Sequence, residues 1–143
     1  MMYRILLADR DEALLAEYRE YLLRDGFDVI TAIDGLDCVA KLRRCRPEAL
    51  VLDPGLLWGD GEGVLAMMHE EADVPLVPVM VLADHANSRG QFGVGVFAVR
   101  VFHLKPVAPH RLAQSLRGLL HPERSWIEVL GGEEFKRGIA SPN

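Results

Sequence analysis

The chain has 143 residues, 50% of them hydrophobic and 26% charged, a size and composition that suit one globular domain with a full hydrophobic core. Its formal net charge of −5 gives no electrostatic reason to expect direct binding of nucleic acid. No apolar run approaches the roughly 18 residues of a membrane span, and no signal peptide is visible. We therefore expect a cytoplasmic protein without a membrane segment.

Short aliphatic or β-branched runs alternate along the chain with segments of helical periodicity. The expected strands are residues 3–8, 27–32, 49–53, 76–83 and 99–104. The expected helices are residues 12–25, 36–45, 62–72 and 109–120. A further helix is expected within residues 87–98, short or frayed because of its glycines, since a right-handed crossover must join the last two strands. Five strands alternating with five helices predict a doubly wound α/β sandwich.

Helix boundaries and buried faces can also be predicted. Gly26 should end the first helix and Pro47 the second. The buried stripes are expected to contain Leu14, Leu15, Tyr18, Tyr21 and Leu22 in the first helix, and Leu36, Val39 and Leu42 in the second. The pattern breaks down after residue 121. We expect a domain over residues 1–121 and a C-terminal extension, linker or tail over 122–143.

Charged residues follow several strands directly, where the binding sites of parallel sheets lie. They are Asp9, Arg10 and Asp11 after the first strand, Asp53 after the third, Asp84 after the fourth and Lys105 after the fifth. Acids from two central strands and a lysine from an edge strand should therefore converge on one crevice. A carboxylate in such a crevice can act as a nucleophile and carry a phosphoryl group. A lysine or a Mg²⁺ ion can neutralise an anion held beside it.

Two stretches carry a resemblance to a known family. VLDPGLLWGDG, residues 51–61, and FHLKP, residues 102–106, resemble the signatures of chemotaxis-type response regulator receiver domains. The resemblance covers residues 3 to 120. It implies a flavodoxin-like (βα)5 fold with a parallel five-stranded sheet in the order 2-1-3-4-5. It also implies a cis peptide bond before Pro106, which X–Pro bonds tolerate.

The resemblance also implies a role for each matching residue. Asp53 matches the phospho-accepting aspartate, and Lys105 matches the lysine that pairs with the phosphoryl group. Asp9, Asp53 and the backbone carbonyl of Gly55 match ligands of Mg²⁺. Phe102 matches the aromatic residue that changes position on activation.

Two positions depart from the family pattern. Ala83 stands where a Ser or Thr hydroxyl is usual, and Arg10 stands where a second acidic Mg²⁺ ligand is usual. The Arg10 guanidinium can point into the pocket and pair with Asp9 and Asp53, supplying one positive charge where Mg²⁺ supplies two. Alternatively, its stem can lie along the surface and leave the pocket one ligand short. In both cases we expect Mg²⁺ binding to be weak or absent.

Three further residues have two readings each. Asp11 is an N-cap or first-turn acid of the following helix, or an extra acid that replaces a metal ligand. Asp84 is a loop acid or an additional member of the crevice. His103 lacks metal-ligand spacing, so a surface or packing role is expected.

The resemblance implies a signalling module, not an enzyme, because no nucleophile–base pair or Gly-rich phosphate loop occurs elsewhere in the sequence. Such a receiver accepts a phosphoryl group on Asp53 from a sensor histidine kinase or phosphotransfer protein and signals to a downstream protein. The alternative is a pseudo-receiver that acts as an interaction domain without phosphorylation, which Arg10 and Ala83 both favour. Homodimerisation, and an effector domain after residue 143, are left open.

Overall fold

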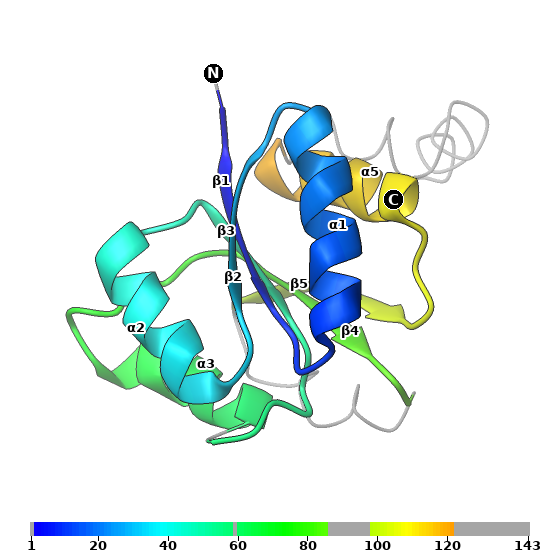
Figure 1. Cartoon of the computed structure of the whole chain (residues 1–143). Helices are drawn as coiled ribbons and strands as arrows, with labels where there is room; N and C mark the ends of the chain where they lie inside the picture. The colour runs from blue at the N-terminus through cyan, green and yellow to red at the C-terminus, as the bar shows by residue number, and fades with distance from the viewer. Residues whose placement is uncertain (1, 59, 86–97, 122–143) are drawn as a thin grey trace, which may run out of the picture.

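A parallel five-stranded sheet forms the centre of the protein in the computed structural model, which describes residues 2–58, 60–85 and 98–121. Its strands are β1 (Arg4–Ala8), β2 (Asp28–Ala32), β3 (Ala49–Leu52), β4 (Val79–Ala83) and β5 (Val99–Leu104). They lie in the order β2-β1-β3-β4-β5, as predicted (Figure 1). The helix expected within 87–98 falls outside the described residues apart from its last position, and the segment 122–143 falls outside them entirely.

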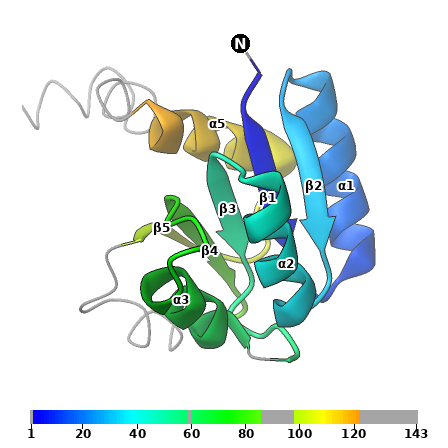
Figure 2. The same cartoon turned by 90° about the vertical axis from the view of Figure 1, so that its left-hand side faces the viewer.

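Helices cover both faces of the sheet. The helices α1 (Glu12–Arg24) and α5 (Pro109–Leu120) lie on one face, and α2 (Gly35–Cys45) and α3 (Asp60–Glu70) lie on the other (Figure 2). The predicted doubly wound sandwich is therefore confirmed. Within the described part of the chain, no helix is long and apolar enough to cross a membrane.

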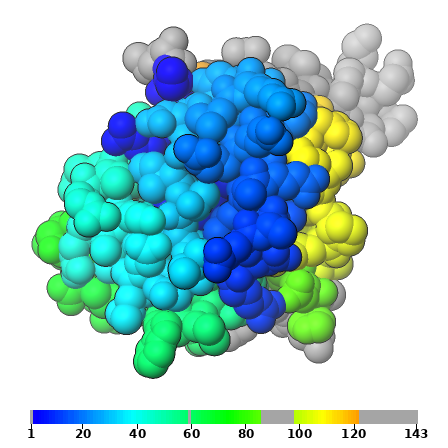
Figure 3. Space-filling model, viewed as in Figure 1, coloured from blue at the N-terminus to red at the C-terminus, as the bar shows by residue number. Residues whose placement is uncertain are grey.

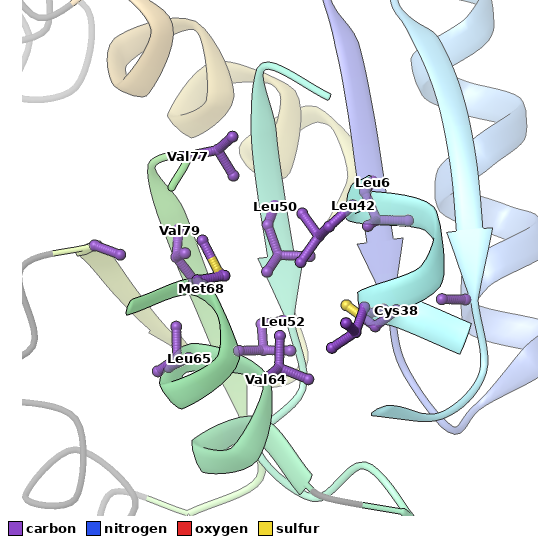
Figure 4. Packing of buried hydrophobic residues seen from close by; sticks show 14 of the residues in the cluster. Leu6, Cys38, Leu42, Leu50, Leu52, Val64, Leu65, Met68, Val77 and Val79 are labelled. Atoms are coloured by element: carbon purple, nitrogen blue, oxygen red, sulfur yellow. The ribbon is translucent and has the colours of Figure 1, made fainter. Parts of the chain in front are cut away.

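Each face of the sheet has its own hydrophobic core. Successive residues of a strand point to opposite faces, so a central strand covered on both sides is apolar almost throughout. On the α2/α3 face, Leu6, Leu50 and Val79 of the strands pack against Leu42 and Met68 of the helices (Figure 4). The opposite core is built from residues of the strands, α1 and α5, including Ile5, Leu7, Leu15, Leu22, Leu112 and Leu116.

Helix ends follow from local sequence. Asp11 is the N-cap of α1, and its Oδ1 accepts a hydrogen bond from the Leu14 amide at 3.1 Å. Gly26 follows α1 with a φ of +97°, a left-handed conformation in which a glycine has no steric penalty. Asp34 caps α2 in the same way as Asp11 caps α1. The interpretation of Asp11 as a helix cap is thus confirmed.

Several sequence expectations were wrong in detail. Leu36 was expected in the core but is 68% exposed, and Tyr21 is also exposed. Gly35 makes the contact with the β3–α3 loop instead, donating its amide hydrogen to the Leu57 carbonyl at 2.8 Å. The strand expected from residue 76 begins at Val79, because Pro78 has no amide hydrogen for the sheet.

Candidate functional site

The acids and the lysine predicted to converge do so at the carboxyl edge of the sheet. Backbone hydrogen bonds hold the first residue after three of the strands: Asp9 N donates to Ala32 O at 3.0 Å, Asp53 N to Ala8 O at 2.9 Å, and Lys105 N to Ala83 O at 2.8 Å. Each side chain therefore projects from a position that a neighbouring strand fixes. In Figure 3 the dark-blue start of α1 and the yellow-green end of β4 meet at the lower rim of the molecule.

Asp53 is the most buried member of this pocket, with 1% of its surface exposed. Its Oδ1 accepts a hydrogen bond from the Gly55 amide at 3.0 Å. Its Oδ2 is buried and has no hydrogen-bond partner. Two cations lie near that oxygen, Arg10 Nε at 3.1 Å and Lys105 Nζ at 3.8 Å. The Arg10 contact is an ion pair whose angles do not meet hydrogen-bond geometry, so Oδ2 is neutralised in charge but not bonded.

Lys105 lies among three carboxylates. Its Nζ is 2.9 Å from Asp9 Oδ2, 3.8 Å from Asp53 Oδ2 and 4.0 Å from Asp84 Oδ1. The peptide bond from Lys105 to Pro106 is cis, as the resemblance implied. The lysine side chain is 15% exposed, so most of its ion pairing takes place away from bulk water.

Burial raises the pKa of the Asp9 carboxyl, because a desolvated carboxylate is less stable than a solvated one. The hydrogen bond with Lys105 and the one that Asp9 Oδ1 accepts from the Asp11 amide at 2.9 Å oppose this rise. The nearby charge of Asp53 adds to it. The two buried acids thus compete for the same lysine.

The Arg10 guanidinium points into the pocket, the first of the two arrangements considered from the sequence. It pairs with Asp53 and donates a hydrogen bond from Nη2 to Asp84 Oδ2. The expected pairing with Asp9 is replaced by the Asp84 contact, since Lys105 holds Asp9. The sequence left open whether Asp84 is a loop acid or a member of the crevice. Its position directly after a central strand was the signal for membership of the crevice.

Ala83, Phe102 and His103 are the remaining residues that the sequence singled out. Ala83 is fully buried in the α2/α3 core, and Phe102 is partly buried against the same core. Trp58, in the loop after β3, is 68% exposed. Of the surface and packing roles considered for His103, the structure shows packing, with Nε2 lying 2.8 Å from Ser115 Oγ of α5.

The residues that the resemblance assigns to Mg²⁺ do not form a vacant ligand set. Among the described residues, no group of three or more His, Cys, Asp or Glu side chains is arranged to hold a metal ion. Arg10 and Lys105 each lie within ion-pair distance of Asp53, and Lys105 also forms an ion pair with Asp9. In this arrangement the pocket does not fit a divalent cation.

Sequence comparisons relate the chain to longer proteins. No protein-family model matches the chain. The "Probable transcriptional regulator ycf27" of Porphyridium aerugineum is 31% identical over 118 residues, which are 82% of this chain and 48% of that protein. The "Transcriptional regulatory protein PrrA" of Mycobacterium tuberculosis is 36% identical over 74 residues, 51% of this chain and 32% of that protein. The chain thus spans about half the length of the ycf27 relatives it matches.

Solved structures with a similar fold are receiver domains. A CheY-like receiver domain from Methanospirillum hungatei superposes with a TM-score of 0.76 at 22% identity, covering 87% of this chain and 98% of that chain. A signal receiver domain from Vibrio parahaemolyticus superposes with a TM-score of 0.70 at 27% identity, covering 91% and 97%. The strand order is that of the flavodoxin-like fold, and the acidic crevice lies at the carboxyl edge of the sheet. The solved structures that the chain resembles are thus response regulator receiver domains, and the curated relatives are transcriptional regulators.

Proposed function

We propose that this receiver domain accepts a phosphoryl group on Asp53 in a two-component phosphorelay and signals through protein–protein contacts. The observation that carries the proposal is the buried Oδ2 of Asp53, which has no hydrogen bond and faces two cations. Buried polar atoms nearly always have a hydrogen-bond partner, so an exception at a sheet's carboxyl edge supports a functional role for this oxygen. The phosphoryl donor would be a sensor histidine kinase or a phosphotransfer protein.

The transfer would follow the chemistry of a carboxylate nucleophile. Oδ2 of Asp53 attacks the phosphorus of a phosphohistidine in line, and the new O–P bond forms as the P–N bond breaks. The histidine nitrogen leaves with the bonding electron pair and takes up a proton. Arg10, whose side chain is 46% exposed, and Lys105 both lie beside Oδ2 of Asp53 and would neutralise the negative charge of the phosphoryl group.

The response would be a population shift at β5, where Phe102 is partly buried against the α2/α3 core and would change its packing. Ala83 presents a buried methyl group where the family has a hydroxyl, and so offers no hydrogen bond to a phosphoryl oxygen. The link between phosphorylation and movement of the loop after β4 should therefore be weaker than in receivers that have the hydroxyl.

Intact-mass spectrometry tests the proposal. The protein is incubated with acetyl phosphate or phosphoramidate, with and without Mg²⁺, and should gain the mass of one phosphoryl group. The Asp53→Asn variant should gain none, because an amide is not a nucleophile of this kind. Absence of the adduct from the parent protein under all these conditions would refute phosphorylation of Asp53.

The second candidate is a pseudo-receiver, an interaction domain that works without phosphorylation. Two observations favour it: the Arg10 guanidinium is paired with Asp53, and Ala83 lacks the hydroxyl. In that case the Arg10–Asp53 pair is a permanent structural contact. The mass experiment separates the candidates, because a pseudo-receiver gives no adduct with either phosphodonor.

A further inference from the structure

The Arg10 guanidinium packs closely against Gly55, and any larger residue at position 55 would force the guanidinium to shift. A Cβ atom added at Gly55 would lie 2.8 Å from Arg10 Cζ, 2.8 Å from Nη1 and 3.0 Å from Nη2. The central carbon and both terminal nitrogens are thus nearly equidistant from this point, as expected when the guanidinium plane lies flat against the Gly55 backbone. The close approach depends on the missing side chain.

Two carboxylates, each following a different strand, hold the guanidinium in this position. Asp53, after β3, lies 3.1 Å from Nε, and Asp84, after β4, accepts the hydrogen bond from Nη2. Asp84 also lies 4.0 Å from Lys105 Nζ, so it faces both cations of the pocket. The planar fork of an arginine suits two acids on different sides, whereas a lysine ammonium would act as a single point charge.

The charge balance leaves little attraction for a further cation. Three carboxylates, those of Asp9, Asp53 and Asp84, face the two cations Arg10 and Lys105. A Mg²⁺ ion binds through carboxylate or carbonyl oxygens together with its own waters. To reach Asp53 and the Gly55 carbonyl it would have to displace the guanidinium and then lie beside Lys105.

We propose that the Arg10 guanidinium takes the place of the metal ion in this pocket. Packed against Gly55 and held by Asp84, it excludes Mg²⁺ and lets Asp53 take up a phosphoryl group without a divalent cation. The ligand class is a tetrahedral phosphoryl group, delivered in the test by phosphoramidate. There the Asp53 O–P bond forms as the P–N bond breaks, and the nitrogen leaves with the electron pair and a proton as ammonia. This inference rests on the proposed phosphorylation of Asp53.

The first measurement is independent of phosphorylation: calorimetric titration of the unmodified protein with Mg²⁺. The parent protein should give no saturable binding heat. Restoring the acid in Arg10→Asp should tighten Mg²⁺ binding by at least about tenfold, the scale on which ligand environment acts on metal affinity. Arg10→Gln adds no negative charge and disturbs the fold less. Its Mg²⁺ affinity should lie between those of the parent protein and Arg10→Asp. Arg24→Gln removes the same charge from the exposed far end of α1 and should behave as the parent.

The second measurement is phosphoryl uptake from phosphoramidate in Mg²⁺ and in EDTA, followed by intact mass. The parent protein should gain the adduct at the same rate in both buffers, and Arg10→Asp should gain it only with Mg²⁺. Saturable Mg²⁺ binding by the parent, failure of both Arg10 variants to bind Mg²⁺, or loss of the parent's adduct in EDTA would each overturn the proposal. If no adduct forms in any buffer, phosphorylation itself is refuted, and the titration still decides whether Arg10 excludes the metal.

Discussion

Replacing Lys105 by Met should lower the free energy of unfolding by about 3 kcal/mol at neutral pH, the lower end of the cost of removing one partner from a buried ion pair. Met keeps an apolar stem but removes the cation 2.9 Å from Asp9 Oδ2 and 3.8 Å from Asp53 Oδ2. Asp9 is almost fully buried, so water cannot replace the lost charge. The lower end applies because Arg10 still neutralises Asp53.

The deficit of Lys105→Met should also shrink as the pH falls. Burial raises the pKa of Asp9 above its ordinary value of 3.8, and the hydrogen bond with Lys105 opposes this rise. Without the lysine the native pKa should rise further, so native Asp9 binds a proton at a pH where unfolded Asp9 does not. A proton bound only by the native state stabilises it. This contribution is complete below 3.8 and is lost as the pH rises through the native pKa, so the deficit is largest at neutral pH.

Urea unfolding followed by circular dichroism at a series of pH values measures the effect. As a control, Arg24→Met removes an exposed cation from its i,i+4 pair with Glu20 and should change stability by less than about 0.5 kcal/mol at every pH. Adding Asp9→Asn to Lys105→Met should restore much of the loss, because it removes the uncompensated charge. A deficit that is constant with pH and unchanged by Asp9→Asn would show that packing of the lysine stem, not charge, is responsible.

Three other predictions follow from burial and close contact. Gly35→Ala should lower stability by at least about 2 kcal/mol, because its Cβ would lie 2.1 Å from a backbone oxygen of the β3–α3 loop, whereas Gly63→Ala, with 3.9 Å of clearance, should be neutral or stabilising in thermal unfolding. Burial lowers the pKa of His103 below 6.5, so its contribution to stability is lost as the pH falls below that value, and His103→Gln should flatten this decline in urea unfolding. One thiol of the native protein, Cys45, should react rapidly with a thiol reagent, because Cys38 is buried with its pKa raised to about 12, and denaturant should expose both; two fast thiols in the native state would contradict this.

The fold could be predicted largely from sequence because its signals are local. Aliphatic runs mark strands buried on both faces, and residues such as Asp11 and Gly26 mark helix ends. The order of the strands is not local information, and the sequence supplied it only through a family resemblance. Leu36 shows the limit of periodicity: it has the helical spacing of a core residue, but the loop after β3 packs on Gly35 and leaves Leu36 in solvent.

The pocket was harder to predict because its contacts join residues far apart in sequence. When each position is considered alone, Arg10 indicates only the loss of a metal ligand, and Asp84 resembles an ordinary loop acid. The roles of these two residues depend on each other, because Asp84 binds the guanidinium that packs against Gly55. Removing Arg10 would leave Asp84 with a distant Lys105 contact at 4.0 Å, and removing Asp84 would loosen Arg10 over Asp53. Substitutions at positions 10 and 84 should therefore be non-additive in stability, as expected for charges that share partners.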